Sequence, residues 1–149
     1  MTAPIHRGGA AISAQAVGAR GWRRAFAVWV AIALAESLHG VARALWLVPA
    51  VGPLRAHHIG VVVACALIFA IAFAAIRWIG AGQFAQQWRI GLAWVAAMLC
   101  FEFGLGLALG LPWARIAADY DPRQGGWMLW GMLFLFAAPA LAAKARGLG

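Results

Sequence analysis

Four apolar segments, each close to the length of a membrane-spanning helix, constrain this chain more than any other feature of its sequence. They cover about residues 25–47, 60–79, 90–111 and 127–143. About 20 apolar residues in a helix cross the roughly 30 Å of hydrocarbon in a bilayer. Backbone groups in lipid must pair within their own segment, and the sequence lacks the alternation of barrel strands. We therefore predict an all-α, integral membrane four-helix bundle.

The composition of the chain favours the same class. Of its 149 residues, 65% are hydrophobic and 11% are charged, and the mean hydropathy is +0.84. A soluble domain carries about 25% charged residues. The net charge of +8 suits basic residues that flank membrane spans, and no soluble segment interleaves arginines with aromatics. The predicted partner is therefore the lipid bilayer and not nucleic acid.

The basic residues predict how the bundle is oriented. Eight of the twelve fall on one side of the four predicted spans: Arg7, Arg20, Arg23, Arg24, Arg77, Arg89, Lys144 and Arg146. Basic residues favour the cytoplasmic side, so we expect both termini there. Residues 1–24 are then a loose basic cytoplasmic segment, and residues 25–149 form the transmembrane domain.

An internal repeat is indicated when the chain is shifted by 66 residues. The matches at this offset are Trp22-Arg23 with Trp88-Arg89, Glu36 with Glu102, Gly40 with Gly106, and Gly60 with Gly126. We predict two tandem two-helix repeats. Residues 21–36 also resemble a secretory signal, but the matching segment 88–102 has the same pattern and cannot be one.

A polar stripe interrupts the first apolar segment. Glu36, His39, Gly40 and Arg43 lie at helical spacing, with Arg43 about 20° around the helix from Glu36. The shift by 66 residues places Glu102 at the same depth in the third segment. Charged side chains are costly in hydrocarbon, so these should face the bundle interior and find partners. We predict Glu36, His39, Arg43 and Glu102 as an ion- or substrate-binding site.

The charge in this layer leaves two roles open. Two carboxylates and one guanidinium sum to −1 when His39 is neutral. A carboxylate without a partner takes up a proton or binds a cation, which couples an ion to the site. The alternative is structural, with the same groups pinning two helices together through buried hydrogen bonds.

Other features of the sequence suggest packing and no enzyme chemistry. Four glycines allow close helix approach near the glutamates: Gly40, Gly104, Gly106 and Gly110. Glu36-x-x-His39 is half of a dimetal ligand set, but Leu105 replaces the second histidine. No nucleophile–base pair, phosphate loop or zinc motif is present, so we predict no metal site and no cofactor, and the sequence does not support an enzyme. Arg115 and Asp119 suit a short interfacial helix in the second outer loop, and His57 and His58 are expected in the first.

Three motifs resemble those of a family of uncharacterised small four-span bacterial inner-membrane proteins. The motifs are E-x-x-H-G-x-x-R at residues 36–43, F-E-x-G at residues 101–104, and A-D-Y-D-P-R-x-G-G at residues 118–126. The resemblance covers most of the chain after Trp22, and it implies a multi-pass protein of the bacterial inner membrane without implying a chemistry. Small proton-coupled multidrug transporters also place one glutamate in their first span, which is an analogy of architecture alone.

Two functions follow as hypotheses. The first is proton- or cation-coupled transport or permeation through the Glu/His/Arg site. The second is a non-catalytic accessory or assembly subunit of a larger membrane complex, in which the buried charges are structural. Four short helices enclose little volume, so either function predicts a homo-oligomer or a larger membrane complex.

Overall fold

A computed structural model describes residues 17–121, 123 and 126–148, and regular structure in these residues is helical. The elements are α1 (Ala19–Ala42), η1 (Arg43–Leu47), α2 (Val48–Val51), α3 (Pro53–Ile79), α4 (Phe84–Ala108), α5 (Trp113–Ala118) and α6 (Met128–Ala145). Residues 1–16, most of the segment predicted to be loose, lie outside the described residues.

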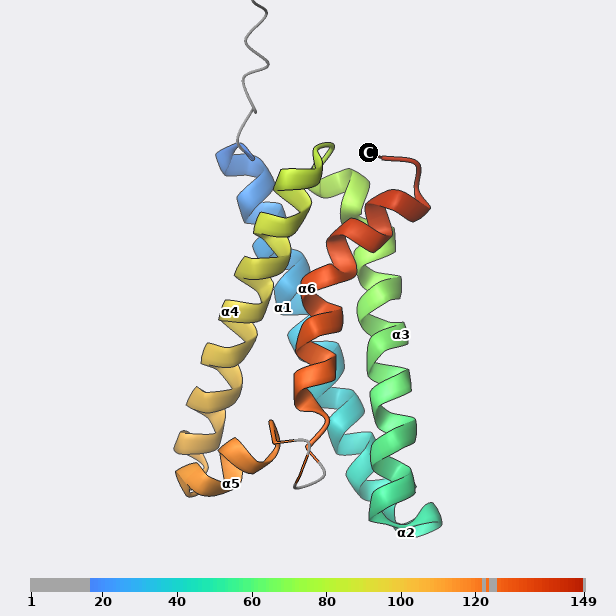
Figure 1. The fold of residues 1–149 in the computed structure, drawn as a ribbon, viewed down its shortest axis with the longest axis vertical. Helices are drawn as coiled ribbons and strands as arrows, with labels where there is room; N and C mark the ends of the chain where they lie inside the picture. The colour runs from blue at the N-terminus through green and yellow to red at the C-terminus, as the bar shows by residue number, and fades with distance from the viewer. Residues whose placement is uncertain (1–16, 122, 124–125, 149) are drawn as a thin grey trace, which may run out of the picture.

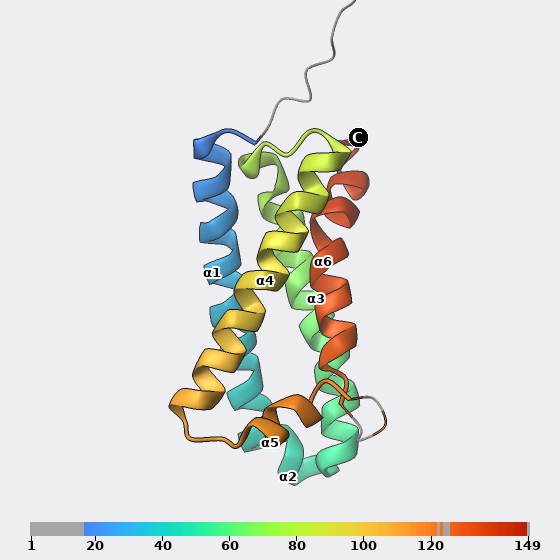
Figure 2. The same cartoon turned by 60° about the vertical axis from the view of Figure 1, so that its left-hand side comes forward.

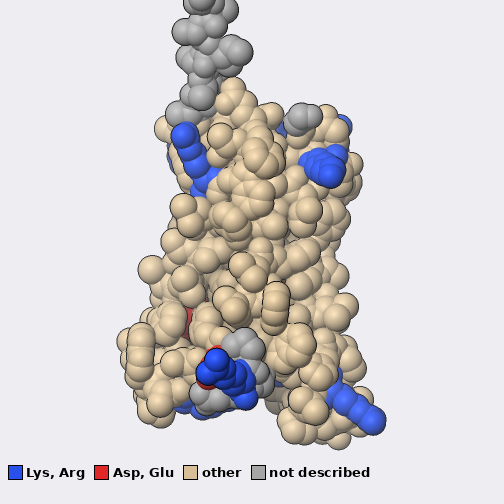
Figure 3. All heavy atoms as spheres, viewed as in Figure 1, with Lys and Arg blue, Asp and Glu red and all other residues tan. Residues whose placement is uncertain are grey.

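Four of these helical stretches are long and apolar enough to cross a membrane. They are Ala19–Val51, Pro53–Ile79, Phe84–Ala108 and Met128–Ala145. The prediction of an all-α architecture with four candidate spans is therefore confirmed for the described residues, and the chain is a multi-pass membrane protein. Figure 3 shows one face of the molecule, with Lys and Arg side chains at its two ends and a band without them in the middle.

The helices run alternately up and down, so the start of α1 and the end of α6 lie at one end of the bundle (Figures 1 and 2). We call this the termini end, and the opposite end, which holds α2 and α5, the loop end. Helix α3 packs between α1 and α6, and α6 also packs along α4. Figure 2 shows α4 and α6 close together at the termini end and diverging towards the loop end.

The dry core of the bundle is concentrated towards the termini end. Its fully buried side chains include Ile32 of α1, Ile76 of α3, Ile90 and Trp94 of α4, and Leu135 of α6. The indole nitrogen of Trp94 donates a hydrogen bond to the carbonyl oxygen of Ala25 at 2.9 Å, which ties α4 to α1. This bond satisfies the one polar atom of the Trp94 side chain in an apolar core.

Gly91 sets the separation of α4 and α6 in this core. A Cβ atom added to Gly91 would overlap the backbone carbonyl of Phe136. Small residues let membrane helices approach closely, because lipid supplies no hydrophobic force to drive helices together and packing contacts must do so. The termini end is therefore closed by direct contact between helices.

The connection between the first two predicted spans is shorter than the sequence suggested. Gly52 has a φ of 83°, which turns the chain in a single residue, and Pro53 begins α3 in the first helical turn. The expectation that His57 and His58 lie in an outer loop is wrong, since both belong to α3. The second apolar segment was predicted to begin at residue 60 because the first turns of α3 carry polar side chains, although these turns are helical.

Candidate binding cavity

A cavity of about 450 Å³ opens in the loop-end half of the bundle, between α1, α3, α4 and α6. All four residues predicted as an ion- or substrate-binding site line it: Glu36, His39, Arg43 and Glu102. Gly40 lies on its wall as well. The structure thus brings the α1 stripe and the α4 glutamate to one place, while their role in binding stays a prediction.

Glu36 and His39 form the first polar contact of the cavity. The Nδ1 atom of His39 lies 3.6 Å from Oε2 of Glu36, one helical turn away, and the two side chains are 15% and 22% exposed. The other carboxylate oxygen, Oε1, is buried and has no hydrogen-bond partner among the described residues. A buried oxygen without a partner costs free energy, so this atom is available to a water molecule, a proton or a cation.

Arg43 lies where α1 changes its winding. The α-helix ends at Ala42, and Arg43 begins the π-helical turn η1. Single π turns are frequent at functional sites, because they insert one residue and re-aim the side chains around it. The aliphatic part of Arg43 crosses Gly60 of α3, since a Cβ atom at Gly60 would lie 2.6 Å from Cδ of Arg43.

Glu102 has a partner that the sequence did not suggest. The hydroxyl group of Tyr120, which follows α5, donates a hydrogen bond to Oε2 of Glu102. Burial, and then the bond to Glu102, raise the pKa of the Tyr120 hydroxyl well above its usual value, so the group stays a donor.

Stacked rings place Tyr120 beside Glu102. The Phe103 ring stacks on Tyr120, with centroids 5.5 Å apart and planes at 11°, and on Trp113, with centroids 5.1 Å apart. Phe103 is the residue after Glu102 on α4. Glu102 and Phe103 of α4 therefore contact the hydroxyl and the ring of Tyr120. These two contacts fix the segment around α5 against α4.

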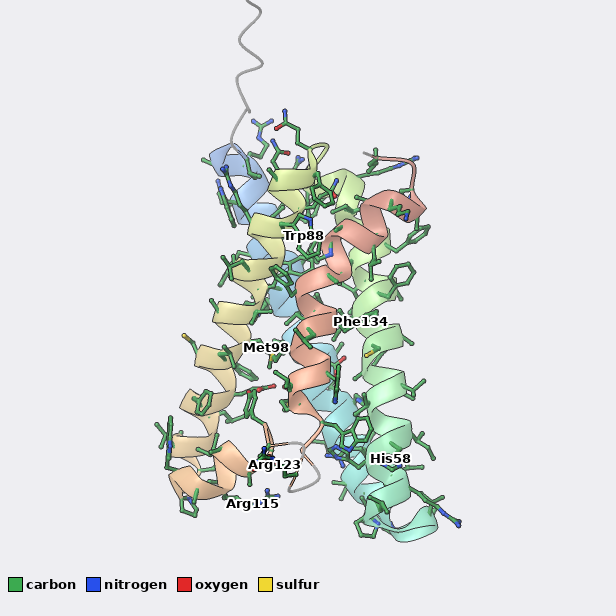
Figure 4. All side chains as sticks on the ribbon, viewed as in Figure 1. His58, Trp88, Met98, Arg115, Arg123 and Phe134 are labelled. Carbon is green, nitrogen blue, oxygen red and sulfur yellow. The ribbon has the colours of Figure 1, made fainter. Side chains whose placement is uncertain are left out.

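His57, Arg115 and Asp119 line the cavity as well. The Nε2 atom of His57 is buried without a hydrogen-bond partner in the described part of the chain. Arg115 and Asp119 form an ion pair at 2.7 Å, which confirms their predicted i, i+4 pairing on a short helix. Figure 4 shows His58, Arg115 and Arg123 at the loop end, far from Trp88 at the termini end.

The predicted packing glycines separate into different environments. Gly106 is buried against Ile116 of α5, whereas Gly40 and Gly104 have open space where a Cβ would stand. Gly110 has a φ of 72° and lies beyond the last residue of α4. Gly110 is therefore not part of a helix-packing face, because the chain has already turned away from the α4 axis.

No group of three metal-ligating His, Cys, Asp or Glu side chains occurs among the described residues. No family model, curated protein or solved structure matches this chain. The class that the fold itself defines is a multi-pass helical membrane protein with a cavity that ionisable side chains line in part. The resemblance to small bacterial inner-membrane proteins rests on the motifs of the chain alone.

Proposed function

We propose that this protein carries out proton- or cation-coupled transport or permeation, with the loop-end cavity as its ion site. The observation that supports this proposal is the shared lining of the cavity by Glu36 and Glu102, which come from different spans. Ionisable side chains within spans that face a cavity are characteristic of ion and substrate pathways.

The charges around the cavity favour a positive occupant. Arg115 and Asp119 pair with each other and cancel. The remaining charges are the two carboxylates and the Arg43 guanidinium, whose Nε atom and aliphatic part lie beside Gly60 of α3. A proton or a small cation would balance the surplus carboxylate, and the buried Oε1 atom of Glu36 offers it an acceptor.

The position of the cavity supports entry of an ion from the loop end. The cavity lies towards the loop end, and the dry core around Ile76, Ile90 and Trp94 separates it from the termini end. With the orientation predicted from the basic residues, the loop end faces away from the cytoplasm. Passage through one protomer would require α4 and α6 to separate at the termini end, and an oligomer would offer a second route.

The second candidate is a non-catalytic accessory or assembly subunit in the bacterial inner membrane. The hydrogen bond from Tyr120 to Glu102 favours it, because this bond fixes an outer segment to α4 as a structural pin would. In this role the lipid-exposed helix faces would bind copies of the chain or other membrane subunits.

Neutralising the two carboxylates separates the candidates. The protein would be reconstituted into vesicles, and dissipation of proton, Na⁺ and K⁺ gradients would be followed for the wild type, Glu36→Gln and Glu102→Gln. We expect the wild type to dissipate at least one gradient, and each variant to do so at least tenfold more slowly at unchanged size on gel filtration.

Asp121→Asn is the matched control, since it also removes a carboxylate at the loop end but does not line the cavity. A wild type that moves none of these ions, with variants that lose their assembly, would favour the accessory subunit. Variants that leave both flux and assembly unchanged would contradict both functions.

A further inference from the structure

A second hollow lies at the termini end, between the start of α4 and the end of α6. Its volume is about 420 Å³. Its lining comes from α4 (Phe84, Gln87, Trp88), from α6 (Ala137, Ala140, Leu141, Lys144) and from the segment after α6 (Gly147, Leu148). Figure 4 shows Trp88 between these two helices near the termini end.

The hollow is a groove with apolar walls and one cation. Ala137, Ala140 and Gly147 are small and leave its space, while Trp88 is held by its ring contact with Phe136 at 4.7 Å. At the rim, Phe84 and Leu141 are 66% and 42% exposed. In a bilayer this rim would face the acyl chains near the membrane surface.

The second polar side chain in the lining is already satisfied. The Nε2 atom of Gln87 donates hydrogen bonds to the carbonyl oxygens of Ala81, at 3.2 Å, and Leu148, at 3.4 Å. Gln87 therefore fixes the segment after α6 at the end of the groove. Lys144 is the charged side chain of the lining, and it is exposed and the only lysine of the chain.

No acidic side chain lies at the termini end, where Lys144 is placed. All four acidic side chains of the protein lie in or beyond the polar layer, towards the loop end: Glu36, Glu102, Asp119 and Asp121. Two arginines at this end each donate a hydrogen bond to a backbone carbonyl, Arg24 to that of Trp78 at 2.8 Å and Arg146 to that of Phe73 at 2.7 Å. No acidic side chain therefore serves as the counter-ion of Lys144, and an anionic ligand in the groove would supply one.

We propose that this groove binds one anionic phospholipid, with its phosphate on Lys144 and an acyl chain between α4 and α6. The two halves of such a ligand match the two parts of the groove, a cation at the surface and an apolar trough beneath it. Basic pockets between membrane helices, on the side where lysine and arginine gather, bind anionic headgroups in this way. A free phosphate would use Lys144 alone and leave the trough empty.

Lipid binding to the purified full chain in neutral detergent tests this proposal. Native mass spectrometry would count bound dioleoyl phosphatidylglycerol and dioleoyl phosphatidylcholine, which have the same acyl chains, and inorganic phosphate would be added as a competitor. We expect one tightly bound phosphatidylglycerol, weaker binding of phosphatidylcholine, and little displacement by phosphate.

Three variants locate the site. Lys144→Gln should weaken phosphatidylglycerol binding about fivefold, the effect of one surface charge on an anionic lipid. Lys144→Arg should retain the binding, which distinguishes a lost charge from a damaged fold. Ala140→Leu fills the trough without changing any charge, and it should weaken the binding of both lipids.

Arg23→Gln is the matched control, because it removes one exposed positive charge at the same end outside the groove. Equal loss of binding in Arg23→Gln and Lys144→Gln would overturn the proposal in favour of general surface attraction. Equal binding of the two lipids to the wild type would overturn it too, as would complete displacement by inorganic phosphate.

Discussion

At the termini end, α4 and α6 touch backbone to backbone at Gly91 and Phe136, whereas towards the loop end the same two helices border a cavity of about 450 Å³. The dry end is built mainly from apolar side chains, and hydrogen bonds from Trp94 and Gln87 cross it. The hollow end holds every acidic side chain of the described residues near or beyond its polar lining. One pair of helices can therefore supply rigidity at one end and a polar site at the other.

The comparison also separates two kinds of close approach. At the dry end a glycine admits a neighbouring backbone, which cannot move without moving a helix. At the hollow end Gly60 admits the aliphatic part of Arg43, a flexible side chain. The same substitution, glycine to alanine, should therefore have different consequences at the two ends.

The largest effect is expected at the dry end. Gly91→Ala should destabilise the protein by about 3 kcal/mol, because its Cβ overlaps the carbonyl of Phe136 and the helices must separate. Thermal unfolding in detergent measures this loss. Gly104→Ala on the same helix is the control, since its Cβ meets open space, and it should be neutral or stabilising by up to about 1 kcal/mol. Equal effects of the two variants would mean that α4 and α6 do not touch here.

A smaller effect is expected where Tyr120 joins the segment after α5 to the cavity. Tyr120→Phe keeps the ring stack on Phe103 and removes the hydrogen bond to Glu102, which should cost about 1–2 kcal/mol. The measurement is thermal unfolding at neutral pH, with Phe103→Leu as the companion variant that disturbs the stack.

The same bond predicts a pH dependence. The folded protein raises the pKa of Tyr120 above the value near 10 of a free tyrosine, so folding keeps the proton on. The stabilisation is fully present below about pH 10 and is lost as the pH rises towards the folded pKa. Because Tyr120 is the only tyrosine, tyrosinate absorbance should stay low in the folded protein at pH 10 and rise on unfolding. A normal titration in the folded protein would contradict the buried hydrogen bond.

The smallest effect on stability is expected at Gly60. Gly60→Ala should cost less than about 1 kcal/mol, because Arg43 can move its side chain away from the new Cβ. The displaced guanidinium lines the cavity, so the variant should nevertheless show a measurable change in ion flux in reconstituted vesicles. A large loss of stability would show that the hollow end is packed as rigidly as the dry end.

The sequence predicted the parts of this molecule that depend on helical spacing. Glu36, His39 and Arg43 were placed on one stripe because the positions of side chains along a helix are local. Glu102 was brought to the same layer by the 66-residue shift, and both glutamates do line one cavity. The tandem repeat itself and the cytoplasmic position of the termini stay predictions.

The missed residues depend on where the chain goes after a helix ends. His57 lines the cavity because Gly52 reverses the chain in one residue, and hydropathy alone does not reveal such a turn. Tyr120 reaches Glu102 because Phe103 stacks on its ring across 17 positions of sequence, a tertiary contact that no local pattern encodes. The sequence could therefore predict Glu102 as a site residue but could not predict Tyr120 as its hydrogen-bond partner.

The π turn at Arg43 makes the number of residues in this part of the first span structurally important. One residue advances a helix by about 100°, so deleting a single residue between Ala44 and Leu47 would rotate the end of the first span against α3. Exchanging one apolar residue for another there would leave the register intact. Among natural variants of this chain, the spacing from Glu36 to Gly52 should therefore be held more strictly than the identity of the residues between.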